Sequence, residues 1–241
     1  MNKFSILTEF EKVYIKNKGN RWFWYFSIFC RVSLSYAFIA AGMVKIVGER
    51  FASGLSVNHP MGAYLESLHH TGYYYTFIGI AQVIAAILLL IPRTVTLGAL
   101  LYFPIIVNIC LLSFAVRFEG SSVTSPLMVL ANLYILVWNY DRLKFILPFK
   151  KFPDYQLVEK PIKYNNKFPA LFFIGVICTI VLVVFIQHFG YEAMPRNSLS
   201  DCQDQFKNTK NEAAGFKFCD CIHNQGMSLE QALQEFEKAK K

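Results

Sequence analysis

Residues 22–47 read WFWYFSIFCRVSLSYAFIAAGMVKIV, an apolar run long enough to cross a lipid bilayer as a helix. Two cations, Arg31 and Lys45, stand inside it, and a charge within a membrane span is costly unless it is paired, hydrated or at the rim. Helical spacing puts one stripe of residues on a single face: Arg31, Ser35, Phe38, Gly42 and Lys45. The two cations then lie about 21 Å apart along the helix axis. We expect this stripe to face protein or a wet cavity.

Four further apolar runs predict an all-α integral membrane protein. The five expected spans cover residues 22–47, 73–91, 94–116, 122–139 and 168–189. Hydrophobic residues make up 54% of the chain and charged residues only 17%, a balance that argues against a soluble protein with five buried helices. The first span follows some twenty hydrophilic residues and contains a charge, so it does not resemble a signal peptide.

The chain is expected to divide into five parts. These are an amphipathic cytoplasmic lead (1–20), a four-helix membrane bundle (21–147), a cytoplasmic linker (148–167), a fifth transmembrane helix (168–190) and a small exported helical tail with cysteines (191–241). Two capping boxes are expected in the tail, Ser200 with Gln203 and Ser228 with Gln231.

Basic residues in the loops predict the orientation. Thirteen Lys and Arg residues lie in the segments on one side of the predicted spans, whereas the opposite short loops offer only Arg50 and Arg117. Positive residues favour the cytoplasmic side, so we expect a multi-pass protein of the bacterial inner (cytoplasmic) membrane with a cytoplasmic N-terminus and a periplasmic C-terminus. The net charge of +8 then reflects topology and contact with anionic lipids. The sequence has no basic stripe interleaved with aromatic residues, so it gives no sign of nucleic-acid binding.

Polar residues at membrane depth are the candidate ligand or partner-binding residues. They are Arg31, Tyr36, Lys45, Gln82, Asn108, Glu119 and Asn132. Arg31 is expected to meet Asn132 or backbone carbonyls, and Lys45 to meet Glu119 or Glu49. One interpretation is that these groups satisfy one another and hold the bundle together. The other is a pocket for a headgroup, a quinone or a substrate, lined by Arg31, Tyr36, Lys45, Gln82 and Asn108.

Three cysteines lie in the expected exported tail, where disulfides are allowed. We expect Cys202 to pair with Cys219 or Cys221, leaving the third thiol free or bonded to a partner. Two further combinations carry metal-ligand residue types: these cysteines with His223, and Glu66 with His70. Their spacings match no common motif, so no metal centre is predicted.

Residues 28–147 resemble the DoxX-like family of bacterial four-helix membrane proteins. The resemblance lies in Ala41-Gly42-x-x-Lys45 after Arg31, in His59-Pro60 and Gly62-Ala63-Tyr64-Leu65, in Leu88-Leu89-Leu90-Ile91-Pro92-Arg93 with Gly98, and in Leu130-Ala131-Asn132-Leu133 with Asp141-Arg142. It implies a four-helix core and a link to redox functions, including a small subunit of thiosulfate:quinone oxidoreductase. The fifth span and the tail look like additions to that core.

No nucleophile–base pair, phosphate-binding loop or metal site is recognisable, so no catalytic residue is predicted. We therefore expect an accessory subunit of a larger membrane or envelope complex, in contact with membrane lipids and other membrane or periplasmic subunits. The alternative is a quinone-linked membrane oxidoreductase subunit that binds a quinone or headgroup at the Arg31/Lys45 face. A transporter has less support, since no inverted repeat is visible.

Overall fold

The computed structural model describes residues 3–146 and 163–240, with side chains from residue 9 onward, and its regular elements there are helices. In chain order they are α1 (Lys3–Lys18), α2 (Arg21–Val47), α3 (Pro60–His69), α4 (Tyr73–Leu90), α5 (Val95–Ala115), α6 (Glu119–Ser122), α7 (Thr124–Trp138), α8 (Tyr140–Ile146), α9 (Ala170–Phe189), α10 (Leu199–Asp204), α11 (Glu212–His223) and α12 (Leu229–Ala239). Five segments are long and apolar enough to cross a membrane: α2, α4, α5, α6 with α7, and α9. The all-helical, multi-pass architecture predicted from the sequence is confirmed.

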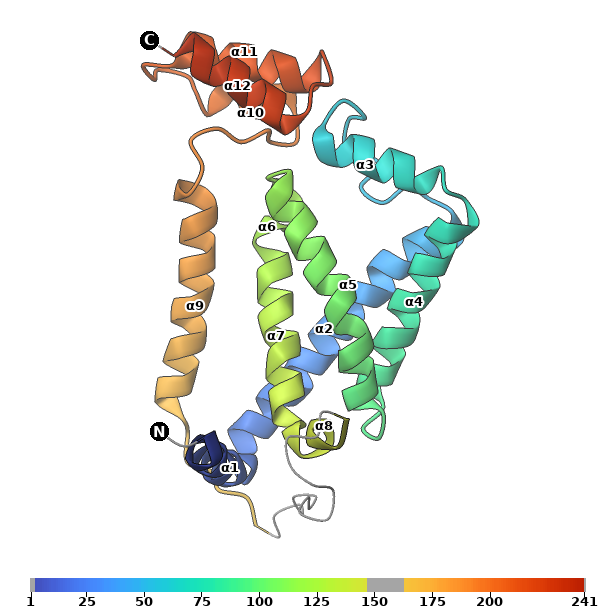
Figure 1. Ribbon diagram of the computed structural model, residues 1–241, viewed down its shortest axis with the longest axis vertical. Coiled ribbons are helices and arrows are strands. Elements are labelled where there is room, and N and C mark those ends of the chain that lie inside the picture. Colours follow the sequence, from blue (N-terminus) through green and yellow to red (C-terminus); the bar gives the residue numbers. More distant parts are fainter. Residues whose placement is uncertain (1–2, 147–162, 241) are drawn as a thin grey trace.

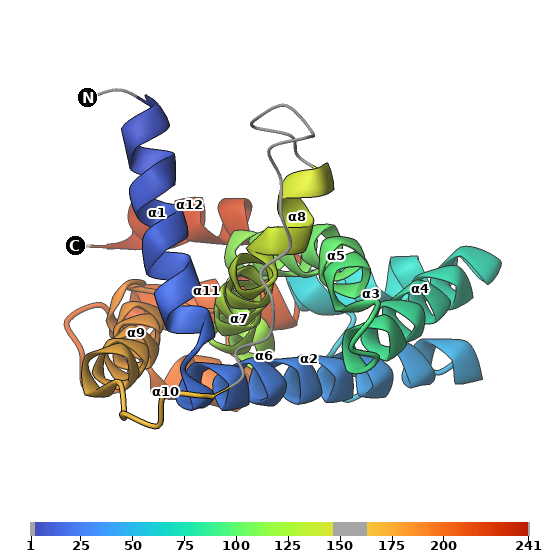
Figure 2. The ribbon, with the colours of Figure 1, turned by 90° about the horizontal axis from the view of Figure 1, so that it is seen from below.

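The first four spans form the membrane bundle (Figures 1 and 2). Helix α2 packs on α4, α4 on α5, α5 on α7, and α7 back on α2. At 27 residues α2 is longer than a bilayer requires, and it crosses the bundle diagonally (Figure 1). The shared core is almost wholly aliphatic and aromatic, with Phe38 stacked on Tyr102 at its centre.

The two ends of the bundle differ. Helices α1 and α8 lie at one end, here called the basic end, and α3 with α10–α12 lies at the other, here called the tail end (Figure 1). Residues 91–94 join α4 to α5 at the basic end, and this short connection makes the two helices antiparallel neighbours. At the tail end, the short helix α3 lies in the loop between α2 and α4.

The fourth span, expected over 122–139, is the continuous helix α7 from Thr124 to Trp138. The one-turn helix α6, from Glu119 to Ser122, precedes it and extends the span toward the tail end. The predicted linker at 148–167 lies outside the described residues as far as 162. Its last residues run beside the start of α2, where Asn165 exchanges backbone hydrogen bonds with Gly19 and Arg21.

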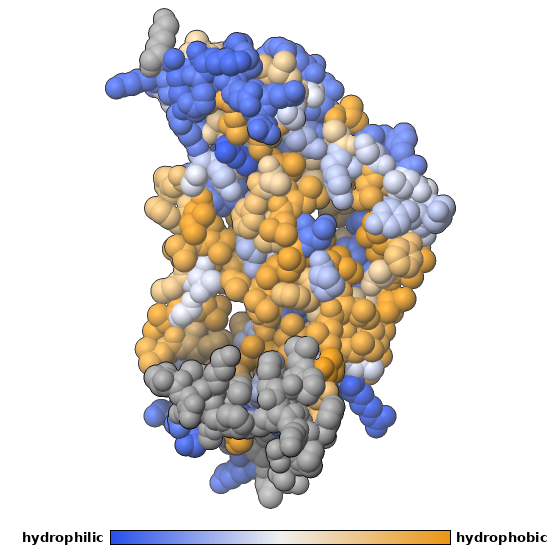
Figure 3. Space-filling view, viewed as in Figure 1, coloured by the Kyte–Doolittle hydropathy of each residue, from blue (hydrophilic) through white to orange (hydrophobic). Residues whose placement is uncertain are grey.

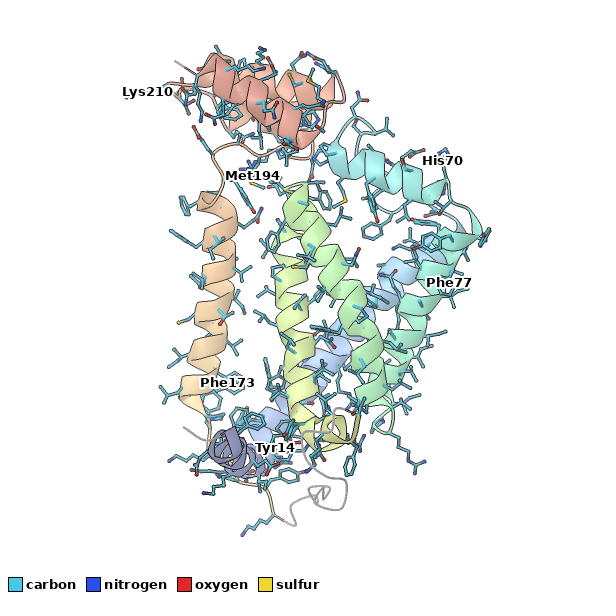
Figure 4. The ribbon with its side chains drawn as sticks, in the orientation of Figure 1. Tyr14, His70, Phe77, Phe173, Met194 and Lys210 are labelled. Atoms are coloured by element: carbon cyan, nitrogen blue, oxygen red, sulfur yellow. A yellow bond between two sulfur atoms is a disulfide. The ribbon has the colours of Figure 1, made fainter. Side chains whose placement is uncertain are left out.

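Helix α9 stands apart from the bundle along most of its length (Figure 1). Only 6% of its most apolar window is buried, against 28–33% for the other four spans. Its ring contacts with the bundle gather at the basic end, where Phe172 packs on Phe23, Phe26 and Tyr134. Figure 4 labels Phe173 at that same end of α9.

Residues 191–240, here called the tail domain, fold around a small core of their own. Phe206, Phe218 and Phe236 pack against one another, and a disulfide joins Cys202 to Cys219. The capping box of Ser228 and Gln231 is confirmed at the start of α12. The box expected at Ser200 is wrong: Ser198 caps α10 by accepting a hydrogen bond from the Asp201 amide.

Hydropathy divides the surface as a membrane protein requires. A hydrophobic belt covers the spans from α9 to α4, and hydrophilic residues cover the tail domain (Figure 3). The belt is interrupted beneath α3, between α5 and α4, where hydrophilic atoms are visible (Figure 3).

Candidate functional site

The crossing of α2 and α4 fixes the position of the candidate site. Gly42 and Gly79 face each other there, and a Cβ at Gly42 would lie only 2.8 Å from the Gly79 carbonyl oxygen. Small residues allow such close approach between membrane helices. The contact keeps two polar side chains in the interface: Lys45 lies over Gly79, and Gln82 lies beside Gly42.

Lys45 is buried, with 7% of its surface exposed. Its ammonium donates a hydrogen bond of 2.9 Å to the Ala41 carbonyl oxygen of its own helix. The Nζ atom also lies 4.5 Å from the ring centre of Phe51 and 5.9 Å from that of Tyr75, within the range of cation–π attraction. The expected pairing of Lys45 with Glu119 or Glu49 is not formed: no acidic side chain in the described residues makes an ion pair with it.

Tyr75 holds the loop that covers Lys45. Its hydroxyl donates to the Glu49 carbonyl oxygen (3.0 Å) and accepts from the Phe51 amide (2.8 Å). The aromatic ring of Phe51 is thereby fixed over the ammonium, so the loop after α2 forms a lid with a defined geometry.

Gln82 is the second polar residue in this interface. Its side chain is 1% exposed, and its amide oxygen has no hydrogen-bond partner among the described residues. A buried polar atom without a partner is unusual in native proteins and calls for an explanation. Of the residues predicted to line a pocket, Lys45 and Gln82 are the two that lie together at the crossing of α2 and α4.

Arg31 belongs to the opposite end of the stripe. Its guanidinium donates to the carbonyl oxygens of Leu89 (2.8 Å) and Leu90 (2.6 Å) at the C-terminus of α4. Those carbonyls lack intrahelical partners, so a cation there is well placed. The expected hydrogen bonds from Arg31 to backbone carbonyls are confirmed. The expected contact between Arg31 and Asn132 is not formed, because the Asn132 amide group donates to the Ala99 carbonyl oxygen (3.0 Å).

The remaining predicted members do not join a common pocket. Tyr36 is 76% exposed on the outside of α2, and Asn108 is exposed on α5. Glu119 pairs with Arg196 of the tail domain at 2.7 Å. The described residues therefore do not show one pocket running from Arg31 to Lys45: Arg31 is bonded to the end of α4, whereas Lys45 is bonded to Ala41 of its own helix.

A network at the basic end was missed from the sequence. The Tyr14 hydroxyl donates to the Asp141 carboxylate (2.8 Å), and Lys18 forms an ion pair with Asp141 at 3.1 Å. Burial and the Asp141 carboxylate raise the pKa of Tyr14 above its usual range, while burial lowers the pKa of Lys18. This network attaches α1 to α8; Figure 4 labels Tyr14 there. The only sequence signal was the four-residue spacing of Tyr14 and Lys18.

The tail domain contacts the bundle through its first residues and through α11, and this interface is here called the latch. Arg117 donates to the Ala193 carbonyl oxygen (2.6 Å) and lies over the Tyr191 ring. Asn58 donates to the His223 carbonyl oxygen (2.9 Å). Figure 4 labels Met194 in this connection, between α9 and the tail domain.

His59 is buried in the latch, with its ring centre 5.9 Å from that of His223. Its Nδ1 atom accepts the Met61 amide and so caps α3. Burial, with a smaller contribution from His223, lowers the pKa of His59 to about 4, and a hydrogen bond with the Arg196 backbone opposes the shift. His59 is therefore neutral near pH 7 in the latched state.

The predicted disulfide is confirmed in its Cys202–Cys219 form, and Cys221 is a free, buried thiol. Glu66 pairs with Arg50 and His70. In the described part of the chain, no group of three or more His, Cys, Asp or Glu side chains is placed to hold a metal ion.

Comparison with known proteins gives one relative to report. No family model matches the chain, and no solved structure matches it. The chain is 35% identical over 128 residues to YwoB of Bacillus subtilis (strain 168), described only as an uncharacterized protein. The match covers 51% of this chain and 81% of YwoB. At this identity and coverage, the chain belongs to the family of Bacillus subtilis YwoB.

Proposed function

We propose that this protein is an accessory subunit of a larger complex in the bacterial inner (cytoplasmic) membrane, without a catalytic centre of its own. The observation that carries the proposal is helix α9, whose most apolar window is only 6% buried. Such a helix, tethered at the basic end by Phe172, leaves most of its surface free for the spans of another subunit.

The polar residues of the bundle support the same role. Arg31, Ser35 and Asn132 each donate to backbone carbonyls of a neighbouring helix. Interhelical hydrogen bonds of this kind hold membrane bundles together. Their donor groups are thereby used within the bundle, as expected of a scaffold.

The proposed orientation places the N-terminus in the cytoplasm and the tail domain on the exported, periplasmic side. The excess of basic residues at the basic end supports it, and so does the Cys202–Cys219 disulfide, since disulfides persist in oxidising compartments. A reporter active only in the cytoplasm, fused after Lys241, is expected to be silent. Activity of that reporter would contradict the five-span orientation.

We also propose a relationship to DoxX-like proteins, which the Arg31…Gly42-x-x-Lys45 pattern supports. Both ends of that pattern have defined positions: Arg31 at the end of α4 and Lys45 beside Gly79. The alternative function, a quinone-linked oxidoreductase subunit, is favoured by Gln82 and Lys45, which are buried and have free hydrogen-bonding capacity. Extraction and analysis of quinones from the purified protein tests this alternative.

The accessory role is tested by recovering partners in mild detergent and identifying them by mass spectrometry. Gly175 lies on α9, and a Cβ at that position would meet no atom within 4 Å, so Gly175→Trp alters the free surface of α9 without disturbing the bundle. Tyr36→Trp is the matched control, because Tyr36 is exposed on α2. A stoichiometric partner lost with Gly175→Trp and kept with Tyr36→Trp is the expected result. Absence of any stoichiometric partner of the unaltered protein would contradict the proposal.

A further inference from the structure

The direction of the Lys45 side chain is the starting point. Lys45 lies two residues before the end of α2, so its ammonium has a short route to water at the tail end. Instead it bonds to the Ala41 carbonyl oxygen, one turn back toward the middle of the membrane. The chain therefore keeps this cation buried when an exposed position is within reach.

No acidic side chain of the described residues neutralises the positive charge of Lys45. Within residues 9–146 and 163–240 the ammonium has one hydrogen bond, to Ala41, and two aromatic faces, Phe51 and Tyr75. An ammonium carries three N–H donors, so two remain for another acceptor. A desolvated charge is stabilised best by an opposite charge, which the described residues do not supply.

Gln82 supplies the complementary group. Gly79 of α4 packs against Lys45, and Gln82 lies three residues further along α4 toward the basic end, about one helical turn away. Its amide oxygen is buried and unpartnered, so it requires a hydrogen-bond donor. Lys45 and Gln82 flank the same glycine crossing and have unused hydrogen-bonding capacity of opposite kinds: N–H donors on Lys45 and an acceptor oxygen on Gln82.

We infer that Lys45 and Gln82 form a binding site for an anionic headgroup, a phosphate or carboxylate, that carries its own hydrogen-bond donor. The anion contacts the Lys45 ammonium beneath the Phe51 ring, and a hydroxyl or ammonium of the ligand donates to the Gln82 oxygen. Phosphatidylglycerol has this chemistry, with a phosphodiester and free hydroxyls. A free oxyanion from solution would meet the same requirement at Lys45. The site is independent of the accessory role and would serve a scaffold or an enzyme subunit alike.

The test uses the full-length protein in detergent, with binding followed by native mass spectrometry and by the shift in melting temperature. The probes are phosphatidylglycerol, phosphatidylcholine, inorganic phosphate and decylubiquinone. Phosphatidylglycerol is expected to bind and to stabilise the protein, and phosphatidylcholine to bind far more weakly. Lys45→Met should weaken binding by roughly tenfold or more, Gln82→Leu should weaken it as well, and Lys45→Arg should retain it. Asn108→Leu, at an exposed polar position on α5, is the control and should bind normally.

The outcomes separate the sources of the ligand. Equal stabilisation by inorganic phosphate, lost with Lys45→Met, identifies a free anion and supports the site. Binding of phosphatidylglycerol alone identifies a lipid. The inference is overturned if neither anion binds, if binding is unchanged in Lys45→Met, or if only decylubiquinone stabilises the protein in a Lys45-dependent way. If Lys45→Met fails to accumulate, Gln82→Leu and Lys45→Arg carry the comparison, and equal binding by Gln82→Leu and the unaltered protein contradicts it.

Discussion

Gly42 and Gly79 lie so close at the crossing of α2 and α4 that a Cβ on either would reach within 2.8 Å or 2.7 Å of the carbonyl oxygen of the other. Neither backbone can yield without separating the two helices. The same contact fixes the position of Lys45. A Cβ atom at position 79 would lie only 2.8 Å from the Lys45 Cβ atom, so the Lys45 side chain fits there only because residue 79 is glycine.

Gly42→Ala is therefore expected to destabilise the bundle. The added methyl group overpacks the crossing, which costs about 1–3 kcal/mol. Thermal unfolding of the purified protein in detergent measures the loss. Gly175→Ala is the matched control, because a Cβ there meets nothing within 4 Å. Equal melting temperatures for both variants would show that the crossing relaxes freely.

Arg31→Leu should lower the stability of the bundle although it makes α2 more apolar. Its loss leaves the Leu89 and Leu90 carbonyl oxygens without their donor, at a cost of roughly 1–3 kcal/mol. Unfolding in detergent, compared with Tyr36→Leu at an exposed position of the same helix, measures the effect. A loss of stability confined to Tyr36→Leu would contradict this role for Arg31.

The helical stripe of α2 was predictable because burial follows a fixed period. Ser35, Phe38, Gly42 and Lys45 are all buried, as their spacing indicated. The acceptor for Arg31 was only partly predictable: the carbonyl oxygens at the end of α4 leave no mark in the pattern of side chains. Asn132 was a plausible acceptor by residue type, but it lies against Ala99 of α5.

Contacts between distant segments were beyond the reach of periodicity. Glu119 follows the third span, and nothing local reveals that Arg196 of the tail domain will lie beside it. The same holds for Asp141 with Tyr14 and Lys18 at the basic end. Choosing Cys219 over Cys221 as the partner of Cys202 also needed the three-dimensional arrangement, since α11 turns Cys219 toward α10.

Removing the Cys202–Cys219 disulfide should loosen the tail domain. The bond closes a loop of 17 residues, which in the chain-entropy model stabilises a fold by about 3 kcal/mol. Cys202→Ser is expected to increase amide exchange throughout α10–α12, measured by mass spectrometry. Cys221→Ser is the control and should leave the disulfide-bonded peptide intact. Recovery of Cys202 and Cys219 as alkylated thiols without reductant would contradict the assignment.

Acid should release the tail domain from the bundle through His59. The pKa of His59 is about 4 in the latched state, against 6.5 for an ordinary histidine, so the released state binds the extra proton more readily. Latching is then complete above pH 6.5 and weakens progressively as the pH falls from 6.5 to about 4. Between pH 7 and pH 5, protease cleavage near residue 195 should rise by roughly tenfold or more.

His59→Asn separates this effect from general acid sensitivity. Asparagine is a good N-cap, so it can replace the His59 ring in accepting the Met61 amide at the start of α3, but it gains no proton in this range. The variant should keep its tail latched at pH 7 and show little rise in cleavage down to pH 5. An equal rise in both proteins would mean that a group other than His59 controls release.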